Sequence, residues 1–344
     1  EEIEILPVDD LSAIVNMQAG IVAGHFRGGR SDEVSYLIDG VPVNDAFGGV
    51  AAVSSLELEA VKDLEVITGT FNAEYGNAMS GVVNAVTKDG ENQFKTSVNY
   101  GLSSYLTKNE RNGEKIYIGL DPYGRNSNSD LKLNISGPII KNKVFFFLNH
   151  RAQNISGHLN GIRRFNTWDL SNFYNQDSSK WKSENTGDSV YVPMSTGEYE
   201  SFMGKVSFDY RKIKFSFMRN INKGSSQSYN HVFKYNPDGR PHEETNTVLS
   251  IFQLNHLLNQ KMFYDVKYSR TVNNYGSYIY KDIDSYYIAP ENGVYNGLNH
   301  LVGDTVYNYI HDKFFTAYGA GFFTGGQEKG HTQRETVTAN IRTD

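Results

Sequence analysis

Residue types that support catalysis or metal binding occur in this sequence, but their spacing does not match a motif for either. The nine histidines show neither the His-x-x-x-His nor the His-Glu-x-x-His spacing that places two imidazoles around a zinc ion. The pairs Gly28-Gly29 and Gly48-Gly49 lack the Gly-Lys-Ser/Thr ending of a phosphate-binding loop. Serine is common, yet no serine lies in a nucleophile elbow. The sequence therefore predicts neither an enzyme nor a cofactor site.

A divalent-cation site is also not predicted. Residues 121–130 are rich in oxygen donors, but they lack the ligand spacing and the terminal glutamate of a calcium-binding loop. Cysteine is absent, which excludes disulfide bonds and thiolate metal sites.

Aromatic residues in the long polar segments form another set of candidates. Their rings could stack on a sugar, a peptide or a metal chelate. Packing within loops and at the boundary between polar and apolar surroundings explains such residues without a ligand, and we favour that interpretation. The candidates for ligand contact are Trp168, Trp181, Tyr191, Tyr286 and Tyr287.

The composition of the 344 residues favours strands and turns. Tyrosine (23), phenylalanine (20) and glycine (32) are abundant and proline is scarce (8), as expected of an all-β chain. The formal net charge of −6 argues against nucleic acid, which requires a basic surface. No apolar run approaches the ~20 residues of a membrane-spanning helix. The chain opens on Glu-Glu-Ile-Glu, so we expect a signal peptide to be removed or the start to be cropped.

Residues 1–90 read as a small α/β unit. We expect a short helix over 11–17, one or two helical turns within 56–63, and strands over 34–38, 64–67 and 81–87. The dipeptide Asp39-Gly40 predicts a tight hairpin turn after the first of these strands.

From about residue 92 the pattern changes to an alternation of apolar and polar residues. About eight strands of roughly ten residues are expected, the length of a membrane-spanning strand. They fall within residues 91–344, near 94–102, 131–136, 144–153, 202–210, 213–220, 245–258, 262–272 and 332–341.

The connections between these strands alternate in length. The short turns 141–143, 211–212 and 259–261 alternate with four long polar segments. This sorting is typical of an outer-membrane barrel, whereas a soluble β-sandwich, the alternative, has no reason for it. An eight-stranded barrel is filled by its own side chains, but barrels of about 22 strands hold a plug. We therefore expect a fragment that holds about 8 of roughly 22 strands behind an N-terminal plug.

Two motifs resemble the plug domain of TonB-dependent outer-membrane receptors. They are FRGGRSDEVSYLIDGVPVND at 26–45 and VKDLEVITGTFNAEYGNAMSGVVNAVTK at 61–88. A third, ISGPIIKNKVFFF at 135–147, resembles the second-to-third strand hairpin of the Oar-like branch, whose members often carry an upstream carboxypeptidase-regulatory-like domain. The resemblance implies transport across the outer membrane of a Gram-negative bacterium, with the protein TonB as energising partner and outer-membrane lipid around the barrel. The short TonB-contacting box of the family is not visible in this sequence.

The resemblance also implies roles for residues of the plug motifs. Arg27 and Glu65 match positions that form ion pairs within the plug or with the barrel, although ordinary turn and strand positions explain them as well. Many receptors carry arginine where this chain has Thr68, so a second arginine contact is not expected. The remaining candidates for gating or packing are Gly28, Asp39, Gly40, Gly69, Tyr75, Gly76 and Gly81, whose glycines suit tight turns and close approaches.

Two classes of function remain open. In the first, the chain belongs to a transporter for an unknown ligand, and the plug closes the pore. In the second, it is a structural or docking subunit of a larger envelope complex, in which the plug merely seals. An importer of the SusC type, with a surface lipoprotein as its lid, lies between the two.

Overall fold

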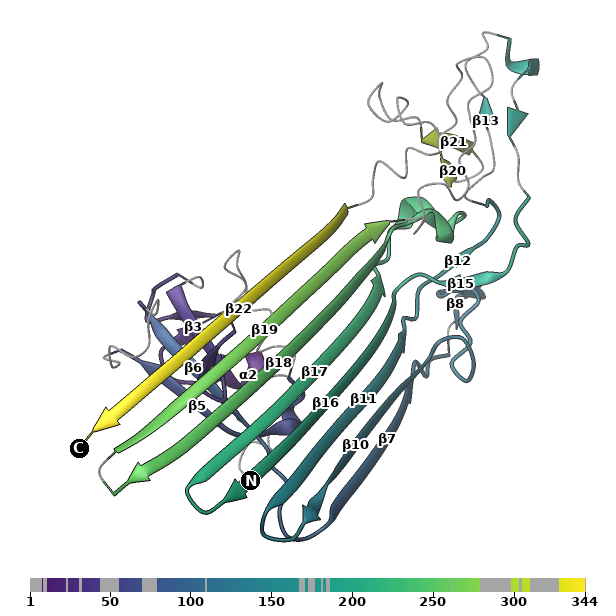
Figure 1. Ribbon diagram of the computed structural model, residues 1–344. Helices are drawn as coiled ribbons and strands as arrows, with labels where there is room; N and C mark the ends of the chain where they lie inside the picture. Colours follow the sequence, from purple (N-terminus) through teal and green to yellow (C-terminus); the bar gives the residue numbers. More distant parts are fainter. Residues whose placement is uncertain are drawn as a thin grey trace.

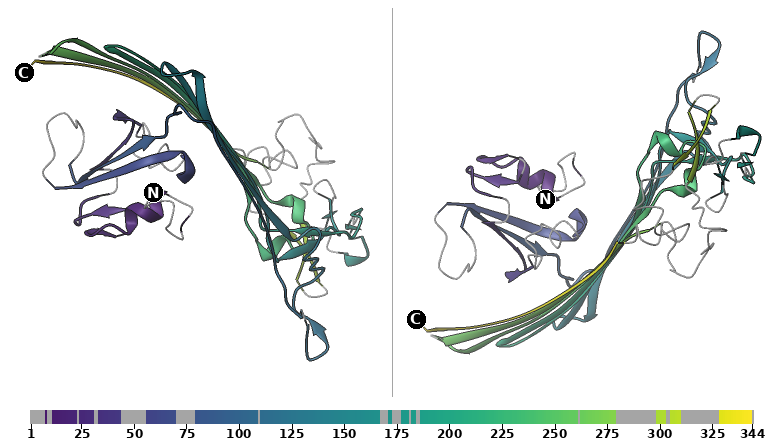
Figure 2. Two further views of the ribbon diagram at one scale, coloured as in Figure 1. Left: turned by 90° about the horizontal axis from the view of Figure 1, so that it is seen from below. Right: turned by 90° about the horizontal axis from the view of Figure 1, so that it is seen from above.

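The computed structural model consists of a small N-terminal plug and one large curved β-sheet (Figure 1). The strands of the large sheet run side by side, and the plug lies on its concave side (Figure 2). Among the described residues, no helix is long and apolar enough to cross a lipid bilayer. The structure describes residues 8, 11–22, 24–30, 33–43, 56–69, 79–108, 110–166, 171–172, 177–180, 182–183, 186–260, 262–278, 298–302, 305–309 and 328–343.

The plug is built on a four-stranded sheet of order β4-β3-β6-β5. Strands β3 and β6 pair in parallel, and the other two pairings are antiparallel. The core is apolar and includes Leu11, Ile14 and Val15 of α2, which are all buried. The elements of the plug are α2 (Leu11–Asn16), β1 (Ile21–Val22), β2 (His25–Phe26), β3 (Val34–Ile38), β4 (Val41–Pro42), η2 (Leu58–Ala60), β5 (Val61–Thr68) and β6 (Gly81–Thr87).

The predicted helix, the strands 34–38 and 81–87 and the Asp39-Gly40 turn are confirmed. Asp39 (φ 50°) and Gly40 (φ 73°) both have positive φ, as a two-residue hairpin turn of this hand requires. The helical turns expected within 56–63 are reduced to the 3-10 turn η2, and β5 begins at Val61 rather than at residue 64. Strand pairing of β5 with β6 starts at Val61↔Thr87, so the neighbouring strand extends β5 beyond its apolar run.

The large sheet has eight strands in the order β22-β19-β18-β17-β16-β11-β10-β7, and every pairing is antiparallel. The predicted number of strands is confirmed. The strands are β7 (Lys95–Ser104), β10 (Ser127–Ile140), β11 (Val144–Ser156), β16 (Thr196–Tyr210), β17 (Ile213–Gln227), β18 (His242–Asn259), β19 (Met262–Tyr278) and β22 (Glu328–Thr343).

Most of these strands are longer than the ten residues predicted. Strand β17, for example, continues to Gln227 through a stretch that is polar on both faces. The alternating pattern fades there, but pairing with β16 and β18 continues. The predicted long loops are correspondingly shorter.

Short elements gather at one end of the large sheet, opposite the three short turns (Figure 1). They are β8 (Glu110–Arg111), β9 (Glu114–Lys115), β12 (Asn160–Ile162), β13 (Ser171–Asn172), η3 (Ser178–Lys180), β14 (Lys182–Ser183), β15 (Tyr191–Pro193), η4 (His231–Phe233), η5 (Pro237–Gly239), β20 (Leu298–Val302) and β21 (Thr305–Tyr309).

The polarity of the two faces of the large sheet is the reverse of that in a soluble protein, where the buried face is apolar and the exposed face is polar. The inner face, toward the plug, buries polar residues such as Asn149, Ser201 and Asn222. The outer face exposes large apolar side chains, among them Phe202, Val206 and Phe217. Because successive strand residues point to opposite faces, this arrangement follows directly from the alternation in the sequence. A soluble sandwich would bury the apolar face against a second sheet.

Candidate functional site: the contacts between plug and barrel wall

The β3–β4 turn presents the carboxylate of Asp39 toward the wall of the large sheet. Two groups of β6 hold it within the plug: the Thr87 amide donates to Oδ1 (2.8 Å) and the Thr87 hydroxyl donates to Oδ2 (2.6 Å). The Gly40 amide donates to the side-chain oxygen of Asn84 (3.0 Å). These hydrogen bonds hold the turn on the plug sheet independently of its contacts with the wall.

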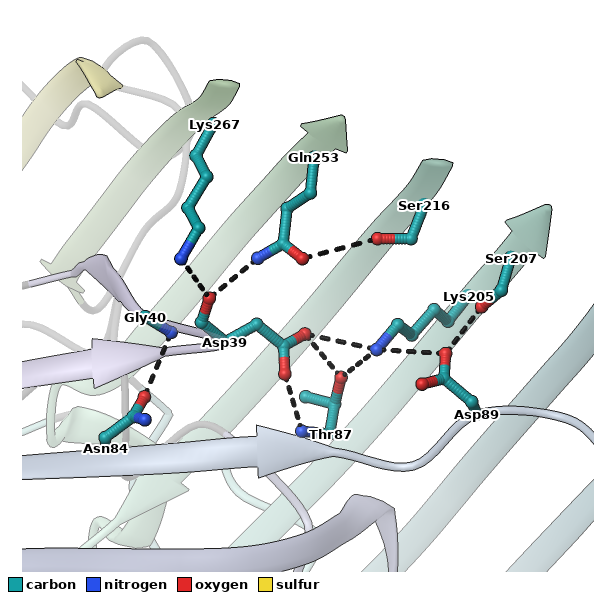
Figure 3. Close-up of polar contacts among 10 residues, drawn as sticks. All are labelled: Asp39, Gly40, Asn84, Thr87, Asp89, Lys205, Ser207, Ser216, Gln253 and Lys267. Atoms are coloured by element: carbon teal, nitrogen blue, oxygen red, sulfur yellow. Dashed lines mark hydrogen bonds and ion pairs between the residues drawn. The ribbon is translucent and has the colours of Figure 1, made fainter. Parts of the chain in front are cut away.

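Lys205, on the inner face of β16, extends its ammonium group into this turn (Figure 3). Its Nζ lies 3.3 Å from Asp39 Oδ2, 2.9 Å from Thr87 Oγ1 and 3.1 Å from Asp89 Oδ1. The side chains of Lys205 and Asp39 are only 5% and 7% exposed. We refer to Asp39, Thr87, Asp89 and Lys205 as the Lys205 cluster.

Neighbouring wall strands add hydrogen bonds to the same turn. The Asp39 carbonyl oxygen accepts from Gln253 Nε2 (2.7 Å) on β18 and from Lys267 Nζ (3.3 Å) on β19. Outside this turn, the Ser207 hydroxyl on β16 donates to Asp89 (2.5 Å), which follows β6. Three wall strands thus converge on one turn of the plug (Figure 3).

Arg151, on the inner face of β11, forms a second contact with the plug. Its guanidinium donates twice to Asp130 of β10 (3.0 and 2.7 Å) and once to Glu57 of the plug (3.0 Å). Nearby, Lys132 Nζ lies 2.9 Å from Glu59 of the plug. We refer to Arg151, Asp130 and Glu57 as the Arg151 cluster.

Glu57 is almost fully enclosed, with 5% of its side chain exposed. Burial raises the pKa of Glu57, and the opposing effect of the Arg151 guanidinium only partly offsets it. The carboxylate therefore carries a desolvation cost that its ion pair does not fully compensate.

An apolar strip on the inner wall completes the interface. Five apolar residues of the wall strands β11, β16, β17 and β18 pack into the core of the plug. They are Phe147, Met203, Met218, Leu249 and Ile251. Beside the Lys205 cluster lies a cavity of about 810 Å³, lined by plug residues such as Asn84 and wall residues such as Lys214. The plug is therefore attached by one apolar strip and two ion-pair clusters, with a cavity beside one of the clusters.

The structure places some of the predicted site residues at the interface and others away from it. Asp39 and Gly40 lie in it, whereas Glu65 is exposed on β5 and pairs across the sheet with Asn84. The Arg27 guanidinium lies beside Gly69 (φ 117°), where Nη1 would be 3.0 Å from an added Cβ. Gly28 has a positive φ (82°), and Gly81 lies against the ring of Phe26. Tyr75 and Gly76 lie outside the described residues.

Of the aromatic candidates for ligand contact, Tyr191 is the one in the described part of the chain. It is 40% exposed, its ring covers Gly119, and the Arg125 guanidinium lies 5.7 Å from the ring centroid. These contacts are those of loop packing. Trp168, Trp181, Tyr286 and Tyr287 lie outside the described residues.

Sequence reasoning missed the residues that carry the interface. Lys205, Arg151 and Glu57 are ordinary charged residues of strands or turns in the sequence, and nothing in their spacing identifies a partner. The one available signal was the charge itself: Lys205 and Arg151 each occupy a polar position of an alternating strand, and the polar positions face the inside of the sheet. In the described part of the chain, no group of three or more histidine or acidic residues could hold a metal ion.

Comparison with known proteins agrees with this arrangement. Residues 2–82 match the family model "TonB-dependent Receptor Plug Domain". The N-terminal unit of this chain is thus a plug domain of the TonB-dependent receptor type. The chain is 36% identical over 125 residues to the TonB-dependent transporter Oar of Myxococcus xanthus. The aligned segment covers 35% of this chain and 12% of the relative. The chain is 35% identical over 83 residues to the vitamin B12 transporter BtuB of Vibrio vulnificus, covering 24% of the chain and 14% of the relative.

Solved structures of TonB-dependent receptors share the fold. The ferric enterobactin receptor PfeA of Pseudomonas aeruginosa superimposes with a TM-score of 0.53 over 80% of this chain and 39% of the receptor, at 13% identity. The unliganded ferric citrate transporter FecA gives a TM-score of 0.51 over 80% and 39%, at 12% identity. The chain thus aligns with well under half of each of these proteins.

Proposed function

We propose that this chain forms the plug and the first barrel strands of an outer-membrane transporter whose pore the plug closes. The buried contact between Lys205 and the Asp39 turn carries the proposal, because it joins the plug to three strands of the inner wall. TonB is the proposed energising partner, supported by the plug family and the Oar-like relative.

The chemistry of the interface supports a plug that can move. A sealed structural unit would gain stability from an apolar interface throughout, since buried ion pairs are weak sources of stability. Here two charged clusters flank one apolar strip, and Asp89 in the Lys205 cluster is 50% exposed. The contact of Lys205 with the half-exposed Asp89 can therefore exchange for water at low cost.

Conductance of the full receptor in planar bilayers tests closure. The intact protein is expected to conduct poorly, and deletion of residues 1–90 to give a large open pore. A deletion variant that inserts but stays closed would contradict the proposal.

A cross-link tests whether the plug must leave the wall. This sequence contains no cysteine, so Asp89→Cys with Ser207→Cys introduces one pair at a position where the native side chains touch. Moderate urea should open the pore in the reduced protein and leave the oxidised protein closed. The single variant Ser207→Cys is the control and should open under both conditions. Equal opening of the oxidised pair would contradict gating at this contact.

A further inference from the structure

Four polar residues interrupt the apolar outer face of the large sheet. Arg219, Ser250, Arg270 and Glu335 are direct cross-strand partners on β17, β18, β19 and β22. All four point outward, because their strand neighbours Met218, Leu249 and Ser269 are buried on the inner face. Arg219, Arg270 and Glu335 are exposed. We call these four residues the outer polar row.

Apolar residues lie on both sides of the outer polar row. One cross-strand row below it, toward the short turns, stand Phe217, Phe252 and Tyr268. One row above it stand Ile221, Val248 and Val272. Charged side chains within the lipid-facing band of a barrel are costly, and two arginines against one glutamate leave the row with a net positive charge that an anionic partner would compensate.

Position along the strands places the row in the outer half of that band. Arg219 is six residues beyond Ile213, the start of β17, and Arg270 is eight residues beyond Met262, the start of β19. A strand crosses the membrane in about 9–11 residues. Since both strands start at short turns, which face the periplasm in outer-membrane barrels, the row lies at the depth of the outer leaflet. Long arginine side chains reach from there to the headgroups.

The charges of the row match a phosphate group. The two arginines stand on either side of Ser250, and two strand spacings put their backbones about 9–10 Å apart. Arginine binds phosphate with a planar pair of donors, and the Ser250 hydroxyl between the two can donate as well. Glu335 lies 3.6 Å from Nε of Arg270, which orients that guanidinium along the sheet. Two residues beyond Ile221, Lys223 adds an exposed positive charge on the same face.

We propose that the outer polar row binds the phosphate group of a phosphorylated glycolipid of the outer leaflet. The inference rests on the proposed location in the outer membrane. It identifies a lipid site on the outer wall, separate from the plug and the transport path.

The test uses the full receptor in nanodiscs of neutral phosphatidylcholine that contain a phosphorylated glucosamine lipid or its dephosphorylated form. Native mass spectrometry then measures retained lipid for the native protein and for Arg219→Gln with Arg270→Gln. At roughly fivefold for each cationic side chain near a charged lipid surface, the pair should lose about thirtyfold in affinity. The dephosphorylated lipid should bind weakly to both proteins.

Two further variants make the result specific. Arg219→Lys with Arg270→Lys keeps the charges and should restore most of the binding. Arg211→Gln, in the short turn between β16 and β17, should behave as the native protein. Equal retention by native and double-glutamine proteins would overturn the inference. So would displacement of the lipid by millimolar inorganic phosphate alone, or capture of a protein at this row by cross-linking from position 219 in outer membranes.

Membrane fractionation before the lipid assay separates the two claims. A receptor found outside the outer membrane would overturn both the inference and the proposed function. A receptor that inserts and gates but shows no phosphate-dependent retention would overturn the lipid site alone.

Discussion

The buried ammonium group of Lys205 joins two carboxylates and a hydroxyl group of the plug. An ion pair at this depth contributes little net stability compared with an apolar contact, but it is expensive to break from one side. Lys205 is therefore the wall residue at which a single substitution should weaken the attachment of the plug most clearly.

Replacing Lys205 by methionine removes the charge and leaves the Asp39 carboxylate buried. Removal of one partner of a buried ion pair costs about 3–5 kcal/mol, and we expect a loss of this order in the free energy of plug attachment. Hydrogen exchange of the β6 amides against urea concentration measures it.

Lys214→Met is the matched control for this substitution. Its Nζ lies 3.1 Å from Asp209, but the two side chains are 69% and 45% exposed, so the expected loss is below about 1 kcal/mol. Equal losses in the two variants would contradict the importance of the Lys205 cluster.

Glu57 should make plug attachment depend on pH. Burial raises its pKa in the attached state, so the attached plug binds a proton more readily than the detached one. Its contribution is most favourable below the ordinary pKa of glutamate and is lost as the pH rises through the raised value. Attachment should therefore weaken across that window in the native protein and stay flatter in Glu57→Gln. Repeating the urea titration between about pH 4 and pH 8 checks this, and a slope unchanged in the variant would refute it.

At the scale of elements, the β3–β4 turn is what brings Asp39 to the wall. Gly40 has a φ of 73°, and a Cβ added there would lie 2.6 Å from Lys267 Nζ. The flexible Lys267 side chain can move aside, so it is the positive φ of the backbone that favours glycine here.

Gly40→Ala should reduce the stability of the attached plug by about 1–2 kcal/mol, the cost of a left-handed conformation for a residue with a Cβ. Gly101→Ala in β7 is the control, because an added Cβ there would be 3.9 Å from its nearest neighbour, Asp130 O. Urea titration of both variants measures this loss of stability. An unchanged stability of Gly40→Ala would contradict the prediction and show that the turn adapts.

The turn was predictable from sequence, but its partner was not. Asp39-Gly40 between two apolar runs is a local signal of a hairpin, and positive φ at both positions confirms it. The contact with Lys205 spans 166 residues and depends on the curvature of the large sheet. For the same reason, Arg27 and Glu65 were reasonable candidates by motif, while Glu57 and Arg151, which form one of the ion pairs between plug and wall, had no local signature. The lengths of the strands were also underestimated, because a segment that is polar on both faces loses the alternating pattern.

At the scale of the whole molecule, the large sheet has an apolar outer face and a polar inner face. Phe217 points outward and is 41% exposed, whereas its neighbour Ser216 points inward and lies 3.5 Å from Gln253. The proposed membrane location predicts opposite tolerance to charge at these adjacent positions.

Phe217→Lys should destabilise the barrel by about 2–4 kcal/mol in lipid, the cost of lysine near the bilayer midplane. Ser216→Lys, which points toward the cavity beside the plug, should cost far less. Folding into lipid vesicles, measured by the heat-modifiable shift in gel mobility over a urea series, separates the two. Equal costs would argue against lipid on the outer face.

The three short turns of the large sheet do not end level with one another. Measured from the row of partners Val144, Phe208 and Leu254, each turn lies further out than the previous one, by roughly one residue per strand. With about 3.4 Å per residue and 4.8 Å between strands, this stagger corresponds to a slope of about 35°. Such a strand climbs ~2.8 Å per residue and clears a ~25 Å apolar band in about nine residues. Strands β16 to β19 have 15 to 18 residues. In the proposed membrane location, their upper portions therefore form a collar that carries the loops well above the lipid.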